Sequence, residues 1–173
     1  MQQLEIFVEA VRVKLVAADV CDGNVVKSPN RPSKDKDLPQ ARVFVASDAA
    51  QPYGSPRIGE MRFAHTSSLV VEVIDVANEG QDLKAKLCAY AQTLLSILLV
   101  DTTWGGDVLE GIGGLRQVYD QPIEGNHVTG RVQVQFDLLW TSEWPLIASG
   151  LVDLTQVDVD VGNGLGSTIA VPQ

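Results

Sequence analysis

The sequence predicts an α+β fold, in which a small mixed or antiparallel sheet is flanked by an N-terminal helix and a long central helix. Residues 69–76 form a nearly continuous apolar run, which is typical of a strand inside a sheet. Residues 82–100 repeat apolar side chains at helical spacing, and residues 131–140 alternate between apolar and polar side chains. We assign residues 1–148 to this α/β domain and residues 149–173 to a C-terminal β-ribbon extension or arm.

Length and composition limit what the protein can be. A chain of 173 residues with 45% hydrophobic content suits one domain with a single core. Its formal charge of -9 argues against holding nucleic acid on a broad basic face. Glu5 and Glu9 interrupt the apolar N-terminus, so it does not have the layout of a signal peptide. The apolar run at 94–100 is shorter than the ~20 residues of a membrane span. We therefore expect assembly in the cytoplasm and no membrane partner.

The first part of the chain predicts one helix followed by an exposed loop. Residues 3–18 place apolar side chains on one helical face. Asp22-Gly23 marks a turn, and Val25-Val26 is a possible edge strand. Residues 27–39 contain three prolines and four basic residues, which predicts an exposed, mobile and locally basic loop.

The middle of the chain should hold the centre of the sheet. Residues 41–47 alternate as a strand does, and the turn-rich residues 47–60 predict a second long loop. The strand at 69–76 should be covered on both faces, because both of its alternating sets are apolar. Asn78, followed three residues later by Gln81, predicts a capping box at the start of the central helix.

The central helix has more apolar surface than one sheet face usually covers. Its main stripe is widened in the last two turns by Leu95, Ile97 and Leu99. Either the first helix or a neighbouring subunit should cover this second half, and the sequence leaves both alternatives open.

The remaining elements are strands and turns. The glycines of residues 102–114 predict irregular structure, and residues 115–119 predict a short strand. Trp144-Pro145 should end the alternating strand. Residues 151–161 then alternate apolar residues with Asp, and the Asn163-Gly164 turn predicts a hairpin. A lone two-stranded ribbon is marginal in water, so we expect this one to be ordered against another chain.

The sequence shows no catalytic or metal-binding constellation. Cys21 and Cys88 are widely spaced and predict reduced thiols, and the two histidines, His65 and His127, predict surface or loop positions. Glu72 and Asp75 are an odd number of residues apart in one strand, so they should point to opposite faces, each requiring a partner if buried. We expect no catalytic residues, no metal, no cofactor and no enzymatic activity.

The order of elements and four segments resemble the tail terminator proteins of long-tailed bacteriophages and the related head-tail completion proteins. The segments are ARVFVAS from Ala41, MRFAHTSSLVVEVID from Met61, LKAKLCAYAQTLLSILL from Leu83 and GNHVTGRVQVQFDLLW from Gly125. The resemblance implies a ring, expected to be hexameric, that sits at the head-proximal end of the virion tail. Such a ring caps the tail-tube protein, stops tail elongation and offers a docking face to the head-tail connector protein.

DNA would pass through that ring without specific binding, and an acidic lumen would keep it from sticking by like-charge repulsion. The acidic candidates for the lumen are Glu5, Glu9, Asp153, Asp158 and Asp160. The candidates for subunit or partner contacts are the basic loop residues, two residues after the first strand, the excess apolar helix residues and the apolar row of the extension. They are Lys27, Arg31, Lys34, Lys36, Tyr53, Arg57, Leu95, Leu99, Leu151, Leu154, Val157, Val159 and Val161.

Two alternatives remain beside this interpretation. The chain could be a head-tail connector or tail-tube subunit, which differs in its position within the particle. It could also be a small ligand-binding domain or enzyme that uses the glycine-rich residues 104–114.

Overall fold

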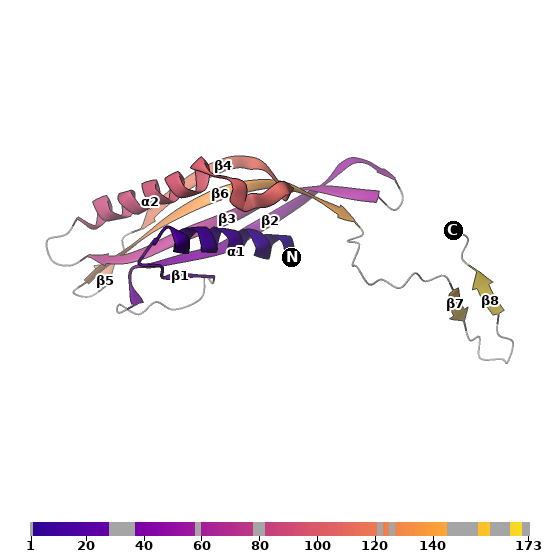
Figure 1. Cartoon of the computed structure of the whole chain (residues 1–173), viewed down its shortest axis with the longest axis horizontal. Coiled ribbons are helices and arrows are strands. Elements are labelled where there is room, and N and C mark those ends of the chain that lie inside the picture. Colours follow the sequence, from indigo (N-terminus) through magenta and orange to yellow (C-terminus); the bar gives the residue numbers. More distant parts are fainter. Residues whose placement is uncertain are drawn as a thin grey trace.

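The computed structural model describes residues 2–27, 37–57, 60–77, 82–120, 123–124, 127–144, 156–159 and 167–170. Its main sheet has the strand order β1-β2-β3-β6-β4, with β5 paired to β6 (Figure 1). This confirms the α+β class predicted from the sequence.

The sheet is built on three long strands. These are β2 (Gln40–Arg57), β3 (Glu60–Ala77) and β6 (His127–Trp144), each of 18 residues, and they pair in antiparallel fashion. The shorter strands lie outside them. β1 (Val25–Val26) is parallel to β2, while β4 (Leu109–Asp120) and β5 (Ile123–Glu124) are antiparallel to β6. The sheet is therefore mixed.

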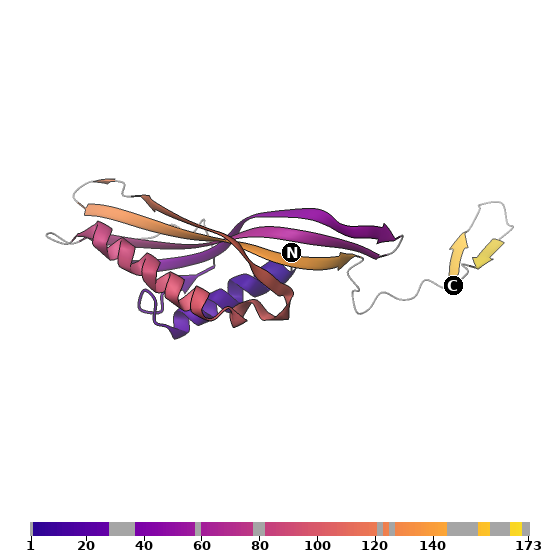
Figure 2. The same ribbon diagram turned by 90° about the horizontal axis from the view of Figure 1, so that it is seen from above.

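Two helices pack on one face of this sheet. α1 (Gln2–Ala17) and α2 (Leu83–Val100) lie on the same side in Figure 2. The core between helices and sheet contains the predicted apolar faces of both helices and the alternating apolar residues of β3 and β6. Its largest fully buried side chains are Phe7, Phe136, Leu15, Leu69, Leu87, Leu94, Leu98 and Leu138.

α2 begins one residue after its predicted start at Asp82. Asp82 is the N-cap, and its carboxylate accepts a hydrogen bond from the backbone N–H of Ala85 at 3.1 Å. The predicted capping box at Asn78 and Gln81 lies outside the described residues. α2 has the length and mean hydropathy (1.4) of a membrane span, but its main stripe is buried in the core.

The second half of α2 is covered in part by α1 and by η2 (Thr103–Val108). Leu95 and Ile97 pack against the core, whereas Leu99 stays 41% exposed. Lys14 of α1 contacts Asp101 just after α2. The indole N–H of Trp104 donates to the carbonyl of Leu98 at 3.0 Å, which holds η2 against the helix end.

Two regions that were predicted to be irregular contain regular secondary structure. Residues 47–60 were predicted as a long loop, but β2 and β3 pair along this stretch, with Tyr53 opposite Arg62. Residues 102–114 were predicted as irregular, but η2 and β4 account for most of them. In β4 the register with β6 slips twice, and both slips end at a glycine, Gly111 and Gly114. The glycines therefore lie at β-bulges, and β4 stays paired with β6 on both sides of each bulge.

The central strand β3 is interior, but helices cover only one of its faces. Val71 and Val73 are fully buried beneath the helices. Glu72 lies on the other face and is 4% exposed, because neighbouring side chains surround it. The prediction that Glu72 and Asp75 point to opposite faces, each with a partner, is confirmed: Asp75 pairs with Lys86 on the helical side at 2.7 Å.

The C-terminal extension contains a second sheet. β7 (Gln156–Val159) and β8 (Ser167–Ala170) pair with each other in antiparallel fashion and share no strand with the main sheet (Figure 1). The predicted hairpin is therefore present.

Candidate subunit interface

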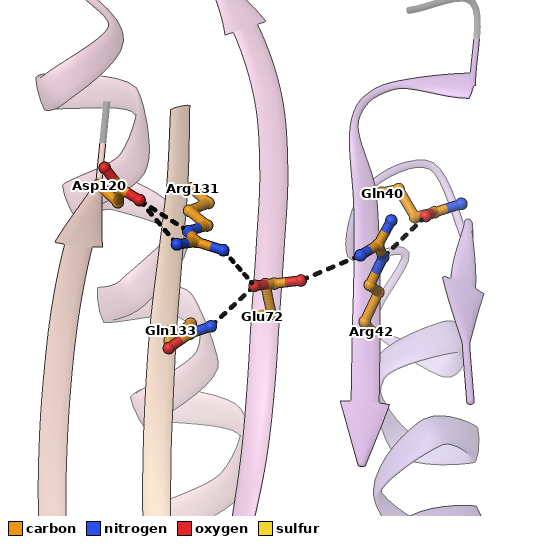
Figure 3. Close-up of polar contacts among 6 residues, drawn as sticks. All are labelled: Gln40, Arg42, Glu72, Asp120, Arg131 and Gln133. Carbon is orange, nitrogen blue, oxygen red and sulfur yellow. Dashed lines mark hydrogen bonds and ion pairs between the residues drawn. The ribbon is translucent and has the colours of Figure 1, made fainter. Parts of the chain in front are cut away.

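The face of the sheet opposite the helices carries a ladder of polar side chains across four strands. Residues on this face alternate with the core residues of the same strands. Arg42 of β2, Glu72 of β3, Arg131 of β6 and Asp120 of β4 lie nearly in one row (Figure 3). We call this side of the sheet the uncovered face, because no helix of the described residues lies on it.

Glu72 is the centre of the ladder. Its Oε2 lies 3.3 Å from Arg42 Nη1, and its Oε1 accepts from Gln133 Nε2 at 2.8 Å. Arg131 Nη1 lies 3.8 Å from Oε1 and its other nitrogens bond to Asp120 (Figure 3). The side chains of Arg42 and Glu72 are only 9% and 6% exposed. Through these partners the buried Glu72 side chain connects the three central strands and fixes them relative to one another.

The charges of the uncovered face are balanced. Among the residues with described side chains, alternation and register place four arginines and four carboxylates on it. They are Arg42, Arg62, Arg116, Arg131, Glu72, Asp120, Asp137 and Glu143. A surface with equal numbers of both charges neither concentrates nor strongly repels a phosphate backbone.

The three long strands extend past the helices. An 18-residue strand spans about 60 Å, whereas an 18-residue helix spans about 27 Å. Figure 2 shows β2, β3 and the end of β6 continuing beyond both helices. We call residues 46–57 and 60–66 the projecting hairpin. Residues 46–54 are all exposed, with Tyr53 59% exposed at the far part. Such a sheet has no apolar layer of its own and gains stability from a partner.

A cluster around His65 lies where the projecting hairpin leaves the body. His65 Nδ1 is 3.1 Å from Asp48 Oδ2, and His65 Nε2 is 2.8 Å from Ser142 Oγ. The ring stacks on Trp140 with centroids 3.9 Å apart. Trp140 in turn donates to Ser67 Oγ, at 2.7 Å. The prediction of a surface or loop position for His65 is wrong, because its side chain is 12% exposed inside β3.

This cluster has the order acid, base and hydroxyl that nucleophilic serine catalysis uses. With the proton on Nδ1, His65 donates to Asp48 and accepts from the Ser142 hydroxyl, which polarises that hydroxyl. Sequence reasoning missed it because Asp48, His65 and Ser142 stand on three separate strands, and only the register brings them together.

The outer strand β4 presents an exposed apolar edge. Leu115, Val118 and Tyr119 are 46%, 39% and 42% exposed. No further strand of the described part of the chain pairs with the outer edge of β4. A long, apolar, unpaired edge favours association with another chain.

The acidic residues of α1 are not a free acidic surface. Glu9 pairs with Arg12 at 2.6 Å and with Lys27 at 2.7 Å, and Lys27 also reaches Glu5 at 3.3 Å. Hydrogen bonds from Arg12 and Lys27 lower the pKa of Glu9 to about 2. Of the predicted lumen acids, Glu5 is exposed and Glu9 is neutralised by two cations. Asp158 lies in β7, and Asp153 and Asp160 lie outside the described residues.

The other predicted contact residues are scattered over the molecule. Lys27 lies beside α1, Tyr53 and Arg57 lie in the projecting hairpin, and Leu99 is exposed at the end of α2, whereas Leu95 packs against the core. Val157 and Val159 are in β7. The remaining six lie outside the described residues, and they are Arg31, Lys34, Lys36, Leu151, Leu154 and Val161.

Neither a protein-family model nor a curated protein matches the sequence. Among the residues that the structure describes, no group of three or more His, Cys, Asp or Glu is placed to hold a metal ion.

Proposed function

We propose that this chain is a structural virion protein that forms a ring at the head-proximal end of a bacteriophage tail. The ring would cap the tail tube, stop its elongation and provide the docking face for the head connector. The proposal starts from the resemblance of the sequence to tail terminator proteins. It is supported most by the projecting hairpin, which is long, exposed and without an apolar layer of its own.

Two further features support assembly with copies of the same chain. β4 is at one end of the strand order, and residues 49–57 of β2, beyond β1, form an outer edge on the other side, so one copy can present β4 to this part of its neighbour. Contacts between two different surfaces generate rings when the rotation closes. A hexamer is the expected ring, with the tail-tube protein and the head-tail connector protein as its partners.

Passage of DNA is compatible with the uncovered face. Its four arginines and four carboxylates offer no net attraction to phosphates, so DNA would slide past without specific binding. In this arrangement the helices lie on the outside of the ring and the polar ladder faces the channel.

The size of the purified full-length protein in solution tests the proposal. We expect light scattering to show a ring-sized assembly, or an assembly that grows with protein concentration, and electron microscopy to show closed rings. A strict monomer at every concentration would contradict the proposal. Labelling the protein in intact virions separates a terminator at the junction of tail and head from a connector or tail-tube subunit.

A second candidate function, serine-dependent acyl transfer, is favoured by one observation, the Asp48–His65–Ser142 geometry. Ser142 Oγ would attack an ester carbonyl while His65 takes its proton and later returns it to the leaving group. A fluorophosphonate probe should then label wild-type protein and fail to label Ser142→Ala. Equal labelling of both proteins, or no labelling of either, excludes this candidate.

A further inference from the structure

An open groove runs between α1 and the outer edge of β2. It has a volume of about 470 Å³ and is lined by Leu4, Glu5 and Val8 of α1, by Lys27, and by residues 43–48 of β2. The groove thus lies between a helix and the side of a strand. This is the setting in which extended segments add to a sheet.

The strand edge inside the groove has free hydrogen-bonding groups. β1 pairs only with Ala41 and Arg42. The N–H of Ala41 points to this outer edge, because it donates to the carbonyl of Asn24 at 2.9 Å. Backbone groups alternate in direction along a strand, so the N–H and C=O of Val45 point to the same edge. No strand of the described ranges pairs with β2 there.

The chemistry of the groove selects its occupant. Val8 is 6% exposed, and it forms an apolar floor with Leu4. The rim carries two carboxylates, Glu5 and Asp48, against one ammonium, Lys27, which is already paired with Glu5 and Glu9. A segment with alternating apolar side chains and no carboxylates on its own side chains therefore fits better than an acidic one.

The C-terminal extension contains one segment of each kind. Residues 151–161 (LVDLTQVDVDV) carry three aspartates, whereas residues 166–173 (GSTIAVPQ) carry no charged side chain. In an extended conformation Ile169 and Val171 lie on the same face, where they can reach the apolar floor. β8, which contains Ile169, pairs only with β7, and a two-stranded sheet alone is marginally stable.

The direction of the chain favours the groove of another copy. The groove lies beside Val45, which pairs with Leu69, whereas β6 ends at Trp144, which pairs with Met61. Met61 and Leu69 are eight positions apart (69 − 61 = 8), so β6 ends about 26 Å farther out, at the far side from the helices (Figure 2). The 11 residues between Trp144 and β7 (155 − 144 = 11) can extend over about 36 Å, so the ribbon can reach a neighbour that packs beside the end of β6.

We infer that residues 166–173 of one copy add as a strand to the outer edge of β2 of a second copy, with Ile169 and Val171 against Leu4 and Val8. This inference rests on the proposed ring, in which it names one of the contacts between neighbouring subunits. It also gives the two-stranded extension the third strand that it needs.

Disulfide trapping between two full-length variants tests the inference. Val45→Cys in one copy and Ile169→Cys in a second, isotope-labelled copy are mixed and mildly oxidised, and the linked peptides are identified by mass spectrometry. We expect a 45–169 link between a labelled and an unlabelled chain. Val157→Cys is the matched control, because Val157 lies opposite Ile169 in β7 and would be one strand farther from β2.

A second variant tests the charge argument with the same pair of cysteines. Val171→Asp places a carboxylate against the acidic rim, and we expect loss of the 45–169 link when this change accompanies Ile169→Cys. The corresponding change in the acidic segment, Val157→Asp with Val159→Asp, should leave the link in place.

The outcomes separate the inference from the proposed function. Rings that form without a 45–169 link, or with an equal 45–157 link, overturn the inference and leave the ring intact. A link found only within one chain, in the double variant Val45→Cys/Ile169→Cys, also overturns it. A strict monomer overturns both.

Discussion

At the scale of single residues, Glu72 is the charge whose loss should matter most. It is 4% exposed and contacts Arg42, Gln133 and Arg131. Glu72→Ala leaves these cationic and amide groups with fewer partners in a buried site. We expect the free energy of unfolding to fall by about 3–5 kcal/mol. Urea denaturation followed by circular dichroism measures this loss.

A surface ion pair gives the matched control. Glu143 pairs with Arg62 at 2.8 Å, but both side chains are more than half exposed. Glu143→Ala should cost no more than about 1 kcal/mol, because solvent screens such pairs. If both variants lose the same stability, the ladder does not hold the strands as described.

The two cysteines should differ in reactivity. Burial, with Asp75 and Asp22 adding to it, raises the pKa of the Cys21 thiol from its ordinary 9.0 to about 12. Cys21 is 5% exposed, and Cys88 is less buried. Since the thiolate is the reactive form, we expect iodoacetamide at pH 8 to modify Cys88 first and Cys21 at least about tenfold more slowly. Peptide mass spectrometry over time measures both rates.

The same shift has a consequence for stability. The folded state binds the proton of the Cys21 thiol more tightly than the unfolded state does. The stabilisation that results from this difference is fully present below pH 9. That contribution is lost as the pH rises from about 9 to about 12. Cys21→Ala should therefore lose less stability than wild type over this range. If the free energy of unfolding fell equally in both proteins over this pH range, the raised pKa of Cys21 would be contradicted.

At the scale of elements, the N-cap of α2 can be tested directly. Asp82→Ala removes the acceptor for the Ala85 N–H, and we expect a loss of about 1 kcal/mol of stability. Asp82→Asn and Asp82→Ser keep an acceptor and should stay close to wild type. Thermal unfolding of the three variants distinguishes a cap from a general charge effect, which Asn and Ser would not rescue.

The elements also show what could be predicted from the sequence. The helix stripes, the alternation of β6 and the interior position of β3 follow from periodicity alone, because burial of an apolar face dictates them. The hairpin at 47–60 was not predicted from the sequence, because Pro52 and Gly54 are turn signals and indicated a loop. Pro52 is tolerated because β2 is an outer strand there, and Gly54, at φ 81°, lies where the register shifts.

The glycines of β4 were likewise interpreted as turn signals, and the prediction of irregular structure was wrong there. A side-chain carbon added at Gly114 would lie 2.5 Å from the carboxylate of Asp137 on β6. This glycine is therefore explained by close approach between neighbouring strands and not by a turn. Contacts across strands, including the Glu72 ladder and the His65 cluster, depend on register, which local sequence patterns do not specify.

At the scale of the whole molecule, the proposed assembly should depend on the projecting hairpin and not on the core. Tyr53 is 59% exposed and makes no contribution to the buried cluster. Tyr53→Asp should change the free energy of unfolding by less than about 0.5 kcal/mol but weaken assembly. Light scattering and thermal unfolding of the same sample measure the two effects separately.

A second exposed position serves as the control for that variant. Val100 is 84% exposed at the end of α2 and is not part of the projecting hairpin. Val100→Asp should leave both stability and assembly unchanged. If it disrupts assembly as strongly as Tyr53→Asp, the contact surface includes the end of α2.

The continuity of β2, β3 and β6 from the body into the hairpin also has a mechanical consequence. β3 and β6 are paired from Met61 to Ala77 with no shift of register, whereas β2 shifts its register against β3 at two places. Tension applied along the strands at the tip is therefore shared by many backbone hydrogen bonds loaded side by side, so the hairpin would transmit a pull to the body as a stiff lever instead of opening one bond at a time.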